Sequence, residues 1–294
     1  MNWFKDLPDD ICKRDVPLGP LTWFKLGGPA DFLIEPRTET QLSTIVRRCQ
    51  DSRIPLHVLG LGANLLVPDE GVRGVVLRLS RGIFPDIRFD TDLVFAGGGF
   101  DMTRLVKTCV KRGLAGLEQI AGIPGTLGGG IAMNCGGRYG EIGSAIVAVR
   151  VMSRDGEIRE RSRDELRFSY RHAALGDDIV LSATLKLQET DPVALNNRFR
   201  EIWDYKHSTQ PSLGAPSAGC IFRNPQGHSA GQLIDRAGLK GFRIGSAFVS
   251  DRHANFAMAD RGGRAADVRR LIDTIIERVA EHSGVRLEPE VKIW

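Results

Sequence analysis

Hydrophobic residues recur along the chain with two spacings, and each spacing predicts one kind of element. Apolar side chains three and four residues apart line one face of a helix. This spacing predicts four helices, over 42–49, 102–110, 195–203 and 265–282. Alternation of apolar with small or polar residues is typical of a half-buried strand, and it occurs at 147–151 and 179–187. Short apolar runs predict further strands at 56–59, 75–79, 89–96, 221–222, 242–249 and 287–294.

Capping and turn residues set the limits of these elements. Thr38 with Gln41 has the spacing of a capping box, and Asp191 followed by a proline reads as an N-cap and the first helical position. Gly113 is placed to end the second helix, and a short helix over 230–237 stops before a glycine. Asp155-Gly156 reads as a hairpin turn. Helices and strands mixed in this way predict an α+β fold.

The chain is long enough for more than one domain. At 294 residues it exceeds the usual size of a single hydrophobic core, so two or three domains are expected. Residues 1–21 are polar and proline-punctuated and read as an N-terminal arm. We expect one domain over 22–190, with subdomains of about 22–80 and 81–190, and a second domain over 191–294 that begins at the N-cap Asp191.

Composition and charge exclude several classes of protein. Hydrophobic residues make up 42% and charged residues 26%, with 40 Lys+Arg interspersed among 36 Asp+Glu. This mild excess does not predict nucleic-acid binding. The five cysteines form no CxxC pair or Cys/His cluster, so neither a disulfide framework nor a metal site is indicated. No signal peptide and no run near the roughly 18 apolar residues of a membrane span is found, which predicts a cytoplasmic protein.

Glycine is concentrated in two segments that predict a ligand. Residues 116–140 hold nine of the 34 glycines, and GLGAN at 60–64 follows a predicted strand. Glycine suits positions where the backbone turns sharply or lies against something bulky, and bare N–H groups can cradle phosphate oxygens. Neither GxGxxG nor GxxxxGK[ST] is present. The two segments therefore favour a flat anionic cofactor or a nucleotide diphosphate, with an ordinary glycine-rich loop as the alternative.

Three single residues remain ambiguous on their own. Arg171 follows a tyrosine in a looped segment and could be a solvated surface arginine. Cys220 lies among small residues, as a buried, inert cysteine would. Glu290 shares one face of a strand with Glu288, which is typical of a solvated face.

Taken together, eight ordered segments resemble the UDP-N-acetylenolpyruvoylglucosamine reductase family. They span Thr22–Ile293, nearly the whole chain, and read FKLGGPADFLIEP, GLGANLLVPDEGVRGVVLRL, GIPGTLGGGIAMNCGG, FSYR, PSAGCIFRNP, SAGQLIDRAGLKGFRIG, VSDRHANF and LEPEVKI. The lengths resemble the shorter branch of the family, which lacks an added insertion in the last domain.

The resemblance implies a fold and a cofactor. The region over 22–190 would be an FAD-binding fold of the vanillyl-alcohol oxidase type, and 191–294 a substrate-binding α+β domain. FAD would be bound without a covalent bond, with its pyrophosphate on the two glycine segments. The implied cofactor-binding residues are Gly60, Leu61, Gly62, Ala63, Asn64, Leu65, Gly122, Ile123, Pro124, Gly125, Thr126, Gly128, Gly129, Asn134 and Gly137.

The resemblance also implies an activity. NADPH would reduce the flavin, and the enolpyruvyl ether of UDP-N-acetylglucosamine would then receive the hydride, which yields UDP-N-acetylmuramate for peptidoglycan synthesis. Arg171 would bind the substrate carboxylate, Cys220 would protonate the α-carbon, and Glu290 would donate a hydrogen bond from a protonated carboxyl. The implied substrate-binding residues are Tyr170, Lys206, Arg223 and Asn224. A monomer with no membrane or nucleic-acid partner is expected.

Three positions depart from the commonest pattern of the family. Cys220 and Ala63 stand where serine is usual, and Arg223 stands where lysine is usual. A thiol is a better acid than an alcohol, so Cys220 is expected to work. Two other functions stay open: an FAD oxidase of the same fold, although Leu61–Asn64 has no histidine for a covalent flavin bond, and a catalytically silent regulator that binds flavin or UDP-sugar.

Overall fold

The computed structural model describes residues 4–212 and 214–294, and these divide into two compact units. Unit 1 comprises the chain up to Arg14, Asp31–Gly60 and Gly74–Lys206. Unit 2 comprises Asp15–Ala30, Leu61–Arg73 and His207–Trp294. Each unit therefore collects segments that are far apart in the sequence.

A four-stranded sheet with one helix forms the first part of unit 1, although the ends of three of its strands belong to the segments of unit 2. Its strand order is β1-β2-β5-β3, with β3 and β5 parallel. The bounds are β1 Cys12–Pro17, β2 Pro29–Ile34, β3 Leu56–Val58 and β5 Val72–Leu77. Helix α1, Glu39–Asp51, begins as predicted, because the Thr38 side chain accepts a hydrogen bond from the Gln41 N–H. The Gln41 side chain in turn accepts from the N–H of Arg37.

The apolar stripe of α1 contacts two hydrophobic clusters. Ile45 and Cys49 pack in the cluster that contains Phe32 of β2. Leu42 and Val46 pack in a second cluster that contains Leu181, from the other sheet of unit 1. The four positions predicted from helical spacing are all buried, so one helix joins the two parts of the unit.

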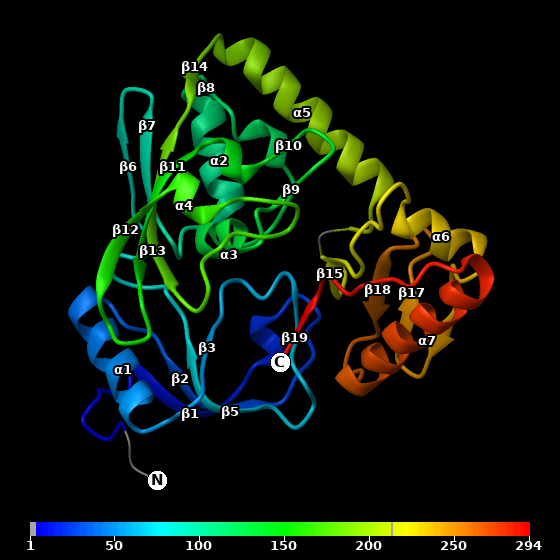
Figure 1. The fold of residues 1–294 in the computed structure, drawn as a ribbon, viewed down its shortest axis with the longest axis horizontal. Helices are drawn as coiled ribbons and strands as arrows, with labels where there is room; N and C mark the ends of the chain where they lie inside the picture. The colour runs from blue at the N-terminus through cyan, green and yellow to red at the C-terminus, as the bar shows by residue number, and fades with distance from the viewer. Residues whose placement is uncertain (1–3, 213) are drawn as a thin grey trace. The chain divides into compact units, whose positions relative to one another are not determined.

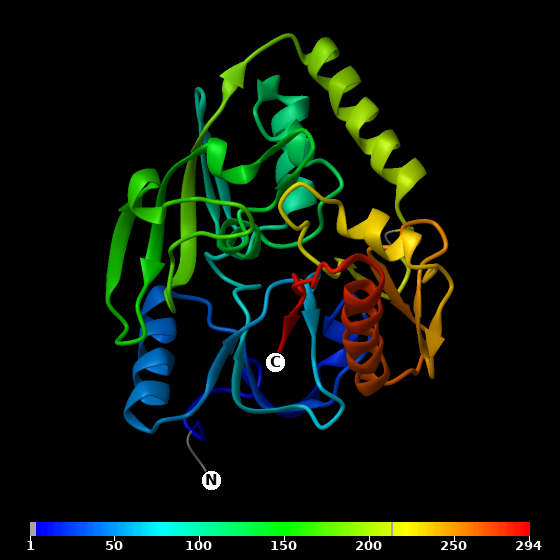
Figure 2. The same cartoon turned by 45° about the vertical axis from the view of Figure 1, so that its right-hand side comes forward.

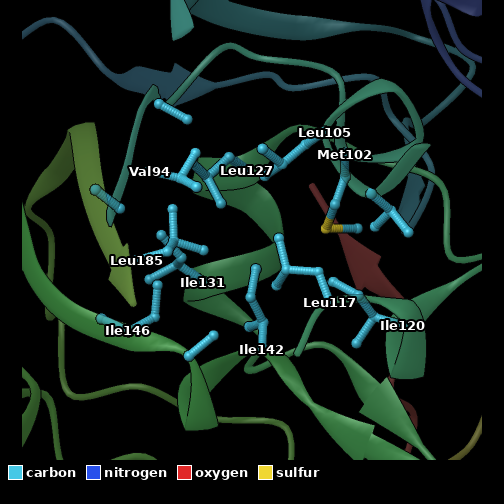
Figure 3. Close-up of a cluster of buried hydrophobic side chains, with 14 of the residues drawn as sticks. Val94, Met102, Leu105, Leu117, Ile120, Leu127, Ile131, Ile142, Ile146 and Leu185 are labelled. Carbon is cyan, nitrogen blue, oxygen red and sulfur yellow. The ribbon is translucent and has the colours of Figure 1, made fainter. Parts of the chain in front are cut away.

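A five-stranded antiparallel sheet forms the second part of unit 1, with α2 and α3 beside it (Figure 1). The strands in spatial order are β12 Ile158–Ser162, β11 Ile146–Met152, β13 Ile179–Lys186, β7 Leu93–Gly97 and β6 Ile87–Asp90. Helix α2 spans Met102–Lys111 and α3 spans Leu127–Ala132. Figure 3 shows Leu127 and Ile131 of α3 among Val94 and Leu185 of the sheet. This core supports the backbone of the long glycine segment.

Short elements complete unit 1. Two-stranded ribbons pair β8 with β14 and β9 with β10. Their bounds, with those of the remaining helices, are β8 Leu114–Ala115, β14 Gln188–Glu189, β9 Gly136–Gly137, β10 Gly140–Glu141, η2 Glu118–Ile120, η3 Ile142–Ser144 and α4 Arg163–Leu166. Helix α5, Pro192–Thr209, begins at Asp191, whose carboxylate accepts from the N–H groups of Val193 and Ala194.

Unit 2 is a four-stranded antiparallel sheet that packs against α7, and Figure 2 shows these elements side by side. The strands in order are β15 Ser217–Cys220, β18 Phe256–Ala259, β17 Ala247–Val249 and β16 Arg243–Ile244. The helices are η1 Gly19–Leu21, α6 Ala230–Arg236 and α7 Ala265–Ser283. A parallel pair joins β4, Leu65–Leu66, to β19, Lys292–Ile293. The end of the first glycine segment, Gly60–Leu65, therefore pairs with the C-terminal strand.

Two predicted strands are hairpins instead. The apolar run 89–96 was expected to be one strand, but Thr91 has φ 53° and turns the chain between β6 and β7. The run 242–249 likewise turns at Gly245, φ 55°, between β16 and β17. Both errors have one cause: a residue with positive φ interrupts a run whose apolar residues continue on either side.

Two further predictions are wrong in register. Val147 was expected on the buried face, but a register shift between Ile146 and Ala148 leaves it 42% exposed. The strand expected at 221–222 lies earlier, at Ser217–Cys220, and Phe222 makes only an isolated bridge to Pro289. A β-bulge causes the first shift, and alternation alone cannot locate a bulge.

The compact units differ from the predicted domains. The stretch 1–21 was expected to be an arm, and residues 1–3 lie outside the described part of the chain. Within the rest of that stretch, β1 belongs to a sheet and Phe4 is buried against Phe32. The packing boundary falls after Lys206 and not at Asp191, because the first four turns of α5 pack on unit 1 through Leu195 and Ile202. The functional division into 22–190 and 191–294 stays a prediction.

Candidate functional site

The first glycine segment, Gly60–Leu65, presents a run of unused backbone donors. In the described part of the chain, the N–H groups of Gly60–Asn64 donate to no protein acceptor. Gly62 has φ 64°, and a Cβ there would lie 2.7 Å from the carbonyl oxygen of Leu21. Successive unpaired N–H groups around a left-handed residue form a concavity that attracts anions. The predicted phosphate role therefore fits the local geometry.

The second glycine segment offers fewer donors than its sequence suggests. The N–H groups of Leu127 and Gly128 donate to the carbonyls of Phe100 and Gly98, at 2.9 and 2.8 Å. The Gly129 N–H reaches the hydroxyl of Thr126, the N-cap of α3, at 3.3 Å. Among the described residues, the N–H groups of Gly125 and Thr126 have no protein acceptor. The available donors of this segment thus lie just before the helix and not in its first turn.

The two glycine segments approach each other at Gly60 and Thr126. A Cβ added to Gly60 would lie 2.6 Å from the Thr126 hydroxyl oxygen. Gly60 has an ordinary φ, so close approach, and not backbone conformation, is what requires glycine there. The unused donors of Gly60 and of Thr126 therefore belong to one neighbourhood of unit 1, as a pyrophosphate bridging both segments would need. The residues present fit FAD.

The other glycines of the predicted cofactor set differ in their reasons. Gly122, φ 73°, and Gly125, φ 147°, are required by backbone conformation. Gly137 has no such φ, and a Cβ there would meet nothing within 4 Å. Neither close packing nor backbone strain requires glycine at position 137. The open space beside it could hold a ligand. Its contact with the cofactor stays a prediction, as do those of Leu61, Ala63, Leu65, Ile123 and Pro124.

Arg171 lies at the tip of a tight turn after α4. Ser169 and His172 exchange two backbone hydrogen bonds, of 3.0 and 3.1 Å, across Tyr170 and Arg171. Arg171 has φ 57°, and a non-glycine residue in this region costs of order 1 kcal/mol or more. The Tyr170 side chain is 49% exposed, and its ring lies 5.1 Å from the Arg171 guanidinium carbon. Backbone strain at Arg171, a charged residue that the sequence singled out, supports a functional role for this residue.

Lys206 contacts the long glycine segment through a hydrogen bond. The Lys206 ammonium donates to the Ala121 carbonyl at 2.6 Å. Burial raises the pKa of the Cys135 thiol to about 12, and the positive charges of Arg171 and Lys206 oppose this rise. A Cβ on Gly122 would lie 3.3 Å from Lys206 Cδ, so the Lys206 side chain packs against this segment. Unit 1 thus places one predicted substrate-binding cation, Lys206, beside the glycine segment.

A basic and aromatic cluster in the same part of unit 1 was not predicted. The Arg138 guanidinium lies 6.0 Å from the Tyr139 ring centre and 5.7 Å from that of Tyr205, which precedes Lys206. The two rings meet edge to face, 6.0 Å apart. The signal in the sequence was Arg138-Tyr139 itself, two large residues inside a run of glycines.

Unit 2 brings Cys220 and Glu290 together. The N–H of Glu290 donates to the carbonyl of Ile221, the residue after Cys220, at 2.6 Å. Cys220 ends β15 beyond a bulge, because it lies three positions after Ser217 while their partners on β18, Met258 and Phe256, lie two positions apart. Gly219 supplies φ 74° at this bulge. The thiol is half-buried, unlike those of the other cysteines.

Asn64 connects the first glycine segment to Glu290. Its side-chain amide donates to the Glu290 carbonyl at 3.2 Å, and its own carbonyl accepts from the Lys292 N–H at 3.1 Å. The buried Asn255 supports the other side, since its amide bonds both the N–H and the carbonyl of Phe222. A predicted cofactor residue and two predicted catalytic residues therefore share one backbone network in unit 2.

Arg223 and Asn224 follow this network directly. The Arg223 N–H donates to the Glu288 carbonyl at 2.9 Å, and its side chain is half-buried. The Asn224 carboxamide oxygen accepts from the N–H of Ala230, the first residue of α6. This bond gives Asn224 a structural task, and the substrate roles of both residues stay predictions.

Within residues 4–212 and 214–294, no group of three or more His, Cys, Asp or Glu side chains is arranged to hold a metal ion. Over the same residues, every helix is too short or too polar to cross a membrane.

Comparisons with known proteins agree with these two parts of the chain. A model of an FAD-binding domain matches residues 30–162, and a model of the C-terminal domain of UDP-N-acetylenolpyruvoylglucosamine reductase matches residues 210–294. The UDP-N-acetylenolpyruvoylglucosamine reductase of Heliobacterium modesticaldum is 43% identical over 283 residues, which cover 95% of this chain and 90% of that protein.

Solved structures give the fold. The crystal structure of UDP-N-acetylenolpyruvylglucosamine reductase from Thermus caldophilus superposes with a TM-score of 0.83 at 38% identity, covering 95% of this chain and 97% of that one. A cholesterol oxidase from B. sterolicum, 18% identical with a TM-score of 0.50 over 63% of this chain and 39% of its own, shares the fold alone. The predicted FAD-binding fold of the vanillyl-alcohol oxidase type is confirmed. The chain belongs to the UDP-N-acetylenolpyruvoylglucosamine reductase family.

Proposed function

We propose that this chain is the FAD-dependent oxidoreductase that reduces UDP-N-acetylenolpyruvoylglucosamine to UDP-N-acetylmuramate in peptidoglycan synthesis. The observation that carries the proposal is 43% identity to a reductase over 95% of the chain. The two family models cover both glycine segments, within residues 30–162, and the network that joins Cys220 to Glu290, within residues 210–294. The substrate is a small UDP-sugar, and NADPH is the proposed source of reducing equivalents.

FAD, when bound and reduced, supplies the hydride for the terminal vinyl carbon of the substrate. The N–H groups of Gly60–Asn64 would hold its pyrophosphate, together with those of Gly125 and Thr126. This assignment rests on their lack of protein acceptors among the described residues. Oriented backbone donors stabilise phosphate oxygens without a charged side chain.

Arg171 is proposed to bind the substrate carboxylate. Hydride addition at the vinyl carbon leaves negative charge delocalised into that carboxylate, and a guanidinium can offer it two parallel N–H donors. The left-handed turn holds Arg171 in place before substrate arrives, so little ordering is left for the reaction itself. Glu290 would add a hydrogen bond to the same developing charge from a protonated carboxyl.

Cys220 is proposed to complete the reaction with a proton. Its S–H bond breaks, a C–H bond forms at the α-carbon, and the resulting thiolate regains a proton from solvent. Hydride plus proton together saturate the double bond, so charge and atoms balance. The bulge at Gly219 sets the position of this thiol at the end of β15. We propose that the enzyme works as a cytoplasmic monomer.

A flavin spectrum and anaerobic stopped-flow mixing test the proposal. The purified protein should carry FAD, NADPH should bleach the flavin absorbance, and the enolpyruvyl substrate should restore it. A flavin that only oxygen reoxidises would support an oxidase instead. A flavin that neither reagent affects would support a silent binding protein, and either result contradicts the proposed activity.

A further inference from the structure

Asn134 is fully buried, and both ends of its amide bond to protein. Its Nδ2 donates to the Ser169 carbonyl at 3.0 Å, and its Oδ1 accepts from the Gly143 N–H at 3.0 Å. A side chain without exposed surface cannot touch a cofactor unless it moves. We propose that Asn134 is a positioning residue, which holds the turn that carries Arg171. This inference rests on the proposed carboxylate-binding role of Arg171.

The bond from Asn134 reaches the base of that turn. The Ser169 carbonyl accepts two hydrogen bonds, one from Asn134 and one from the His172 N–H at 3.1 Å. A carbonyl oxygen has two lone pairs, so both are used and the direction of this peptide is set. Arg171 lies two residues later with φ 57°. A turn with a left-handed arginine persists only where its surroundings restrain it, and Asn134 supplies that restraint from outside the turn.

The surroundings of the Asn134 side chain are tightly packed near Gly143. A Cβ on Gly143 would lie 2.8 Å from Asn134 Oδ1 and 2.8 Å from the Phe168 ring. The Gly143 carbonyl accepts from Arg163 Nε at 3.0 Å. A shift of the Asn134 side chain along the line from Gly143 to Ser169 would stretch one of its two hydrogen bonds and compress the other, which is the restraint that a positioning residue needs.

Asn134 also follows the cofactor segment along the chain. Its N–H donates to the Ile131 carbonyl at the end of α3, whose N-cap is Thr126. Its own φ is 39°, which asparagine tolerates better than most residues. One short helix thus separates the proposed FAD donors from the residue that holds the Arg171 turn. The fold couples where the flavin lies to where the substrate carboxylate binds.

A double-mutant cycle on the FAD-loaded enzyme tests this role. Asn134→Asp keeps the size and the acceptor for Gly143 but replaces the donor to Ser169 with an oxygen. Anaerobic reoxidation of the reduced flavin by the enolpyruvyl substrate should slow about 10- to 100-fold, as expected for a misplaced binding group. FAD content and the rate of reduction by NADPH should stay within about twofold of wild type. Asn197→Asp, the same change at an exposed position of α5, is the matched control.

The decisive comparison uses Arg171→Ala. If Asn134 acts through Arg171, Asn134→Asp should slow reoxidation no further in the Arg171→Ala background. Multiplying effects of the two changes would overturn the inference while leaving the role of Arg171 intact. Normal reoxidation by Arg171→Ala alone would instead contradict the proposed role of Arg171. Loss of FAD from Asn134→Asp, with normal reoxidation in the flavin-containing fraction, would return Asn134 to the cofactor site.

A pH series separates positioning from general damage. A protonated aspartic acid at position 134 regains a donor for the Ser169 carbonyl, and burial favours the neutral form. The slowing belongs to the ionised carboxylate, so the ratio of the Asn134→Asp rate to the wild-type rate should be lowest at about pH 8 and should rise as the pH falls to about 6. A ratio that does not change with pH would contradict the inference. Should Asn134→Asp fail to fold, Gly143→Ala crowds the opposite end of the same amide group, at Asn134 Oδ1, and should give the same selective slowing.

Discussion

Among single residues, the five cysteines divide by burial. Four of them, Cys12, Cys49, Cys109 and Cys135, are buried, and Cys220 is half-buried. Burial raises the pKa of Cys49 to about 11 and those of Cys109 and Cys135 to about 12. These thiols remain protonated at neutral pH, where the thiolate is the reactive form. Reaction at a cysteine sulfur is therefore confined to Cys220, the residue that follows the bulge at Gly219.

The first prediction concerns Cys220. Cys220→Ala should leave reduction of the flavin by NADPH unchanged and slow reoxidation by the enolpyruvyl substrate at least about 100-fold, the usual contribution of a positioned acid. Cys220→Ser should stay active, because the hydroxyl can donate the same proton. Stopped-flow absorbance measures both half-reactions. Normal turnover by Cys220→Ala would eliminate Cys220 as the proton donor.

The second prediction concerns the buried thiols and pH. An unfolded thiol ionises near its ordinary pKa of 9.0, whereas folded Cys109 holds its proton up to about pH 12. The unfolded state therefore binds fewer protons in this interval, and stability falls as the pH rises through it. Each such thiol contributes about 1.4 kcal/mol per pH unit to the slope. Urea unfolding with a reductant present, at pH values from about 9 to about 11, should show a shallower decline for Cys109→Ala than for wild type. Equal slopes would contradict the buried, protonated state.

Among the elements, α7 begins with a cap from a distant segment. Its own N-cap residue, Arg264, makes no side-chain cap bond. Instead the Asp69 carboxylate accepts from the N–H groups of Ala265 and Ala266, at 2.7 and 3.0 Å. Asp69 belongs to the segment that follows the first glycine run, so this cap joins that segment to the longest helix of unit 2. An acidic group is also favoured there by the helix dipole.

The third prediction tests this cap. Asp69→Ala should lower the free energy of unfolding by about 1–2 kcal/mol, the cost of losing an N-cap. Asp273→Ala removes the same charge from an exposed pair with Arg269 on α7, 3.5 Å apart, and should cost at most about 0.5 kcal/mol. Urea unfolding followed by circular dichroism measures both. Equal losses from the two variants would show that Asp69 acts only through its charge.

Over the whole molecule, chain order and packing order differ. Residues 61–73 leave unit 1 after Gly60 and join the C-terminal part of the chain in unit 2. There β4 pairs in parallel with β19, in the register Leu65 with Lys292. The segment proposed to hold the FAD pyrophosphate is thus ordered by the last residues of the chain. A short strand alone would not be stable without such a partner.

The fourth prediction follows from that pairing. A chain ending at Val291 loses the bonds from Lys292 N–H to Asn64 and from Trp294 N–H to Leu66, at 3.1 and 3.2 Å. At about 1 kcal/mol each, their loss should weaken FAD binding by about tenfold or more. Titration of the apoprotein with FAD, followed by flavin fluorescence, measures this. Lys292→Ala keeps both backbone bonds and should bind FAD normally; an unchanged affinity in the shortened chain would disprove the coupling.

The sequence predicted what depends on local spacing. The helical stripe of Leu42, Ile45, Val46 and Cys49 is buried as expected, and the caps at Thr38 and Asp191 hold because they involve residues within one turn. The family resemblance added FAD, the substrate and the fold, which the comparisons confirm at that level. The roles of Arg171, Cys220 and Glu290 stay predictions, although the structure gives each a restrained backbone position.

Tertiary structure decided what depends on distant partners. The sequence alone could not show that Asn134 bonds to Ser169, 35 residues away, or that Asn64 meets Glu290, 226 residues away. It also could not distinguish the donors of Gly125 and Thr126 from those of Leu127 and Gly128, because the latter are taken by carbonyls of another loop. Local propensity sets helices, strands and caps; which polar groups are left for a ligand is settled only when long-range hydrogen bonds have used the rest.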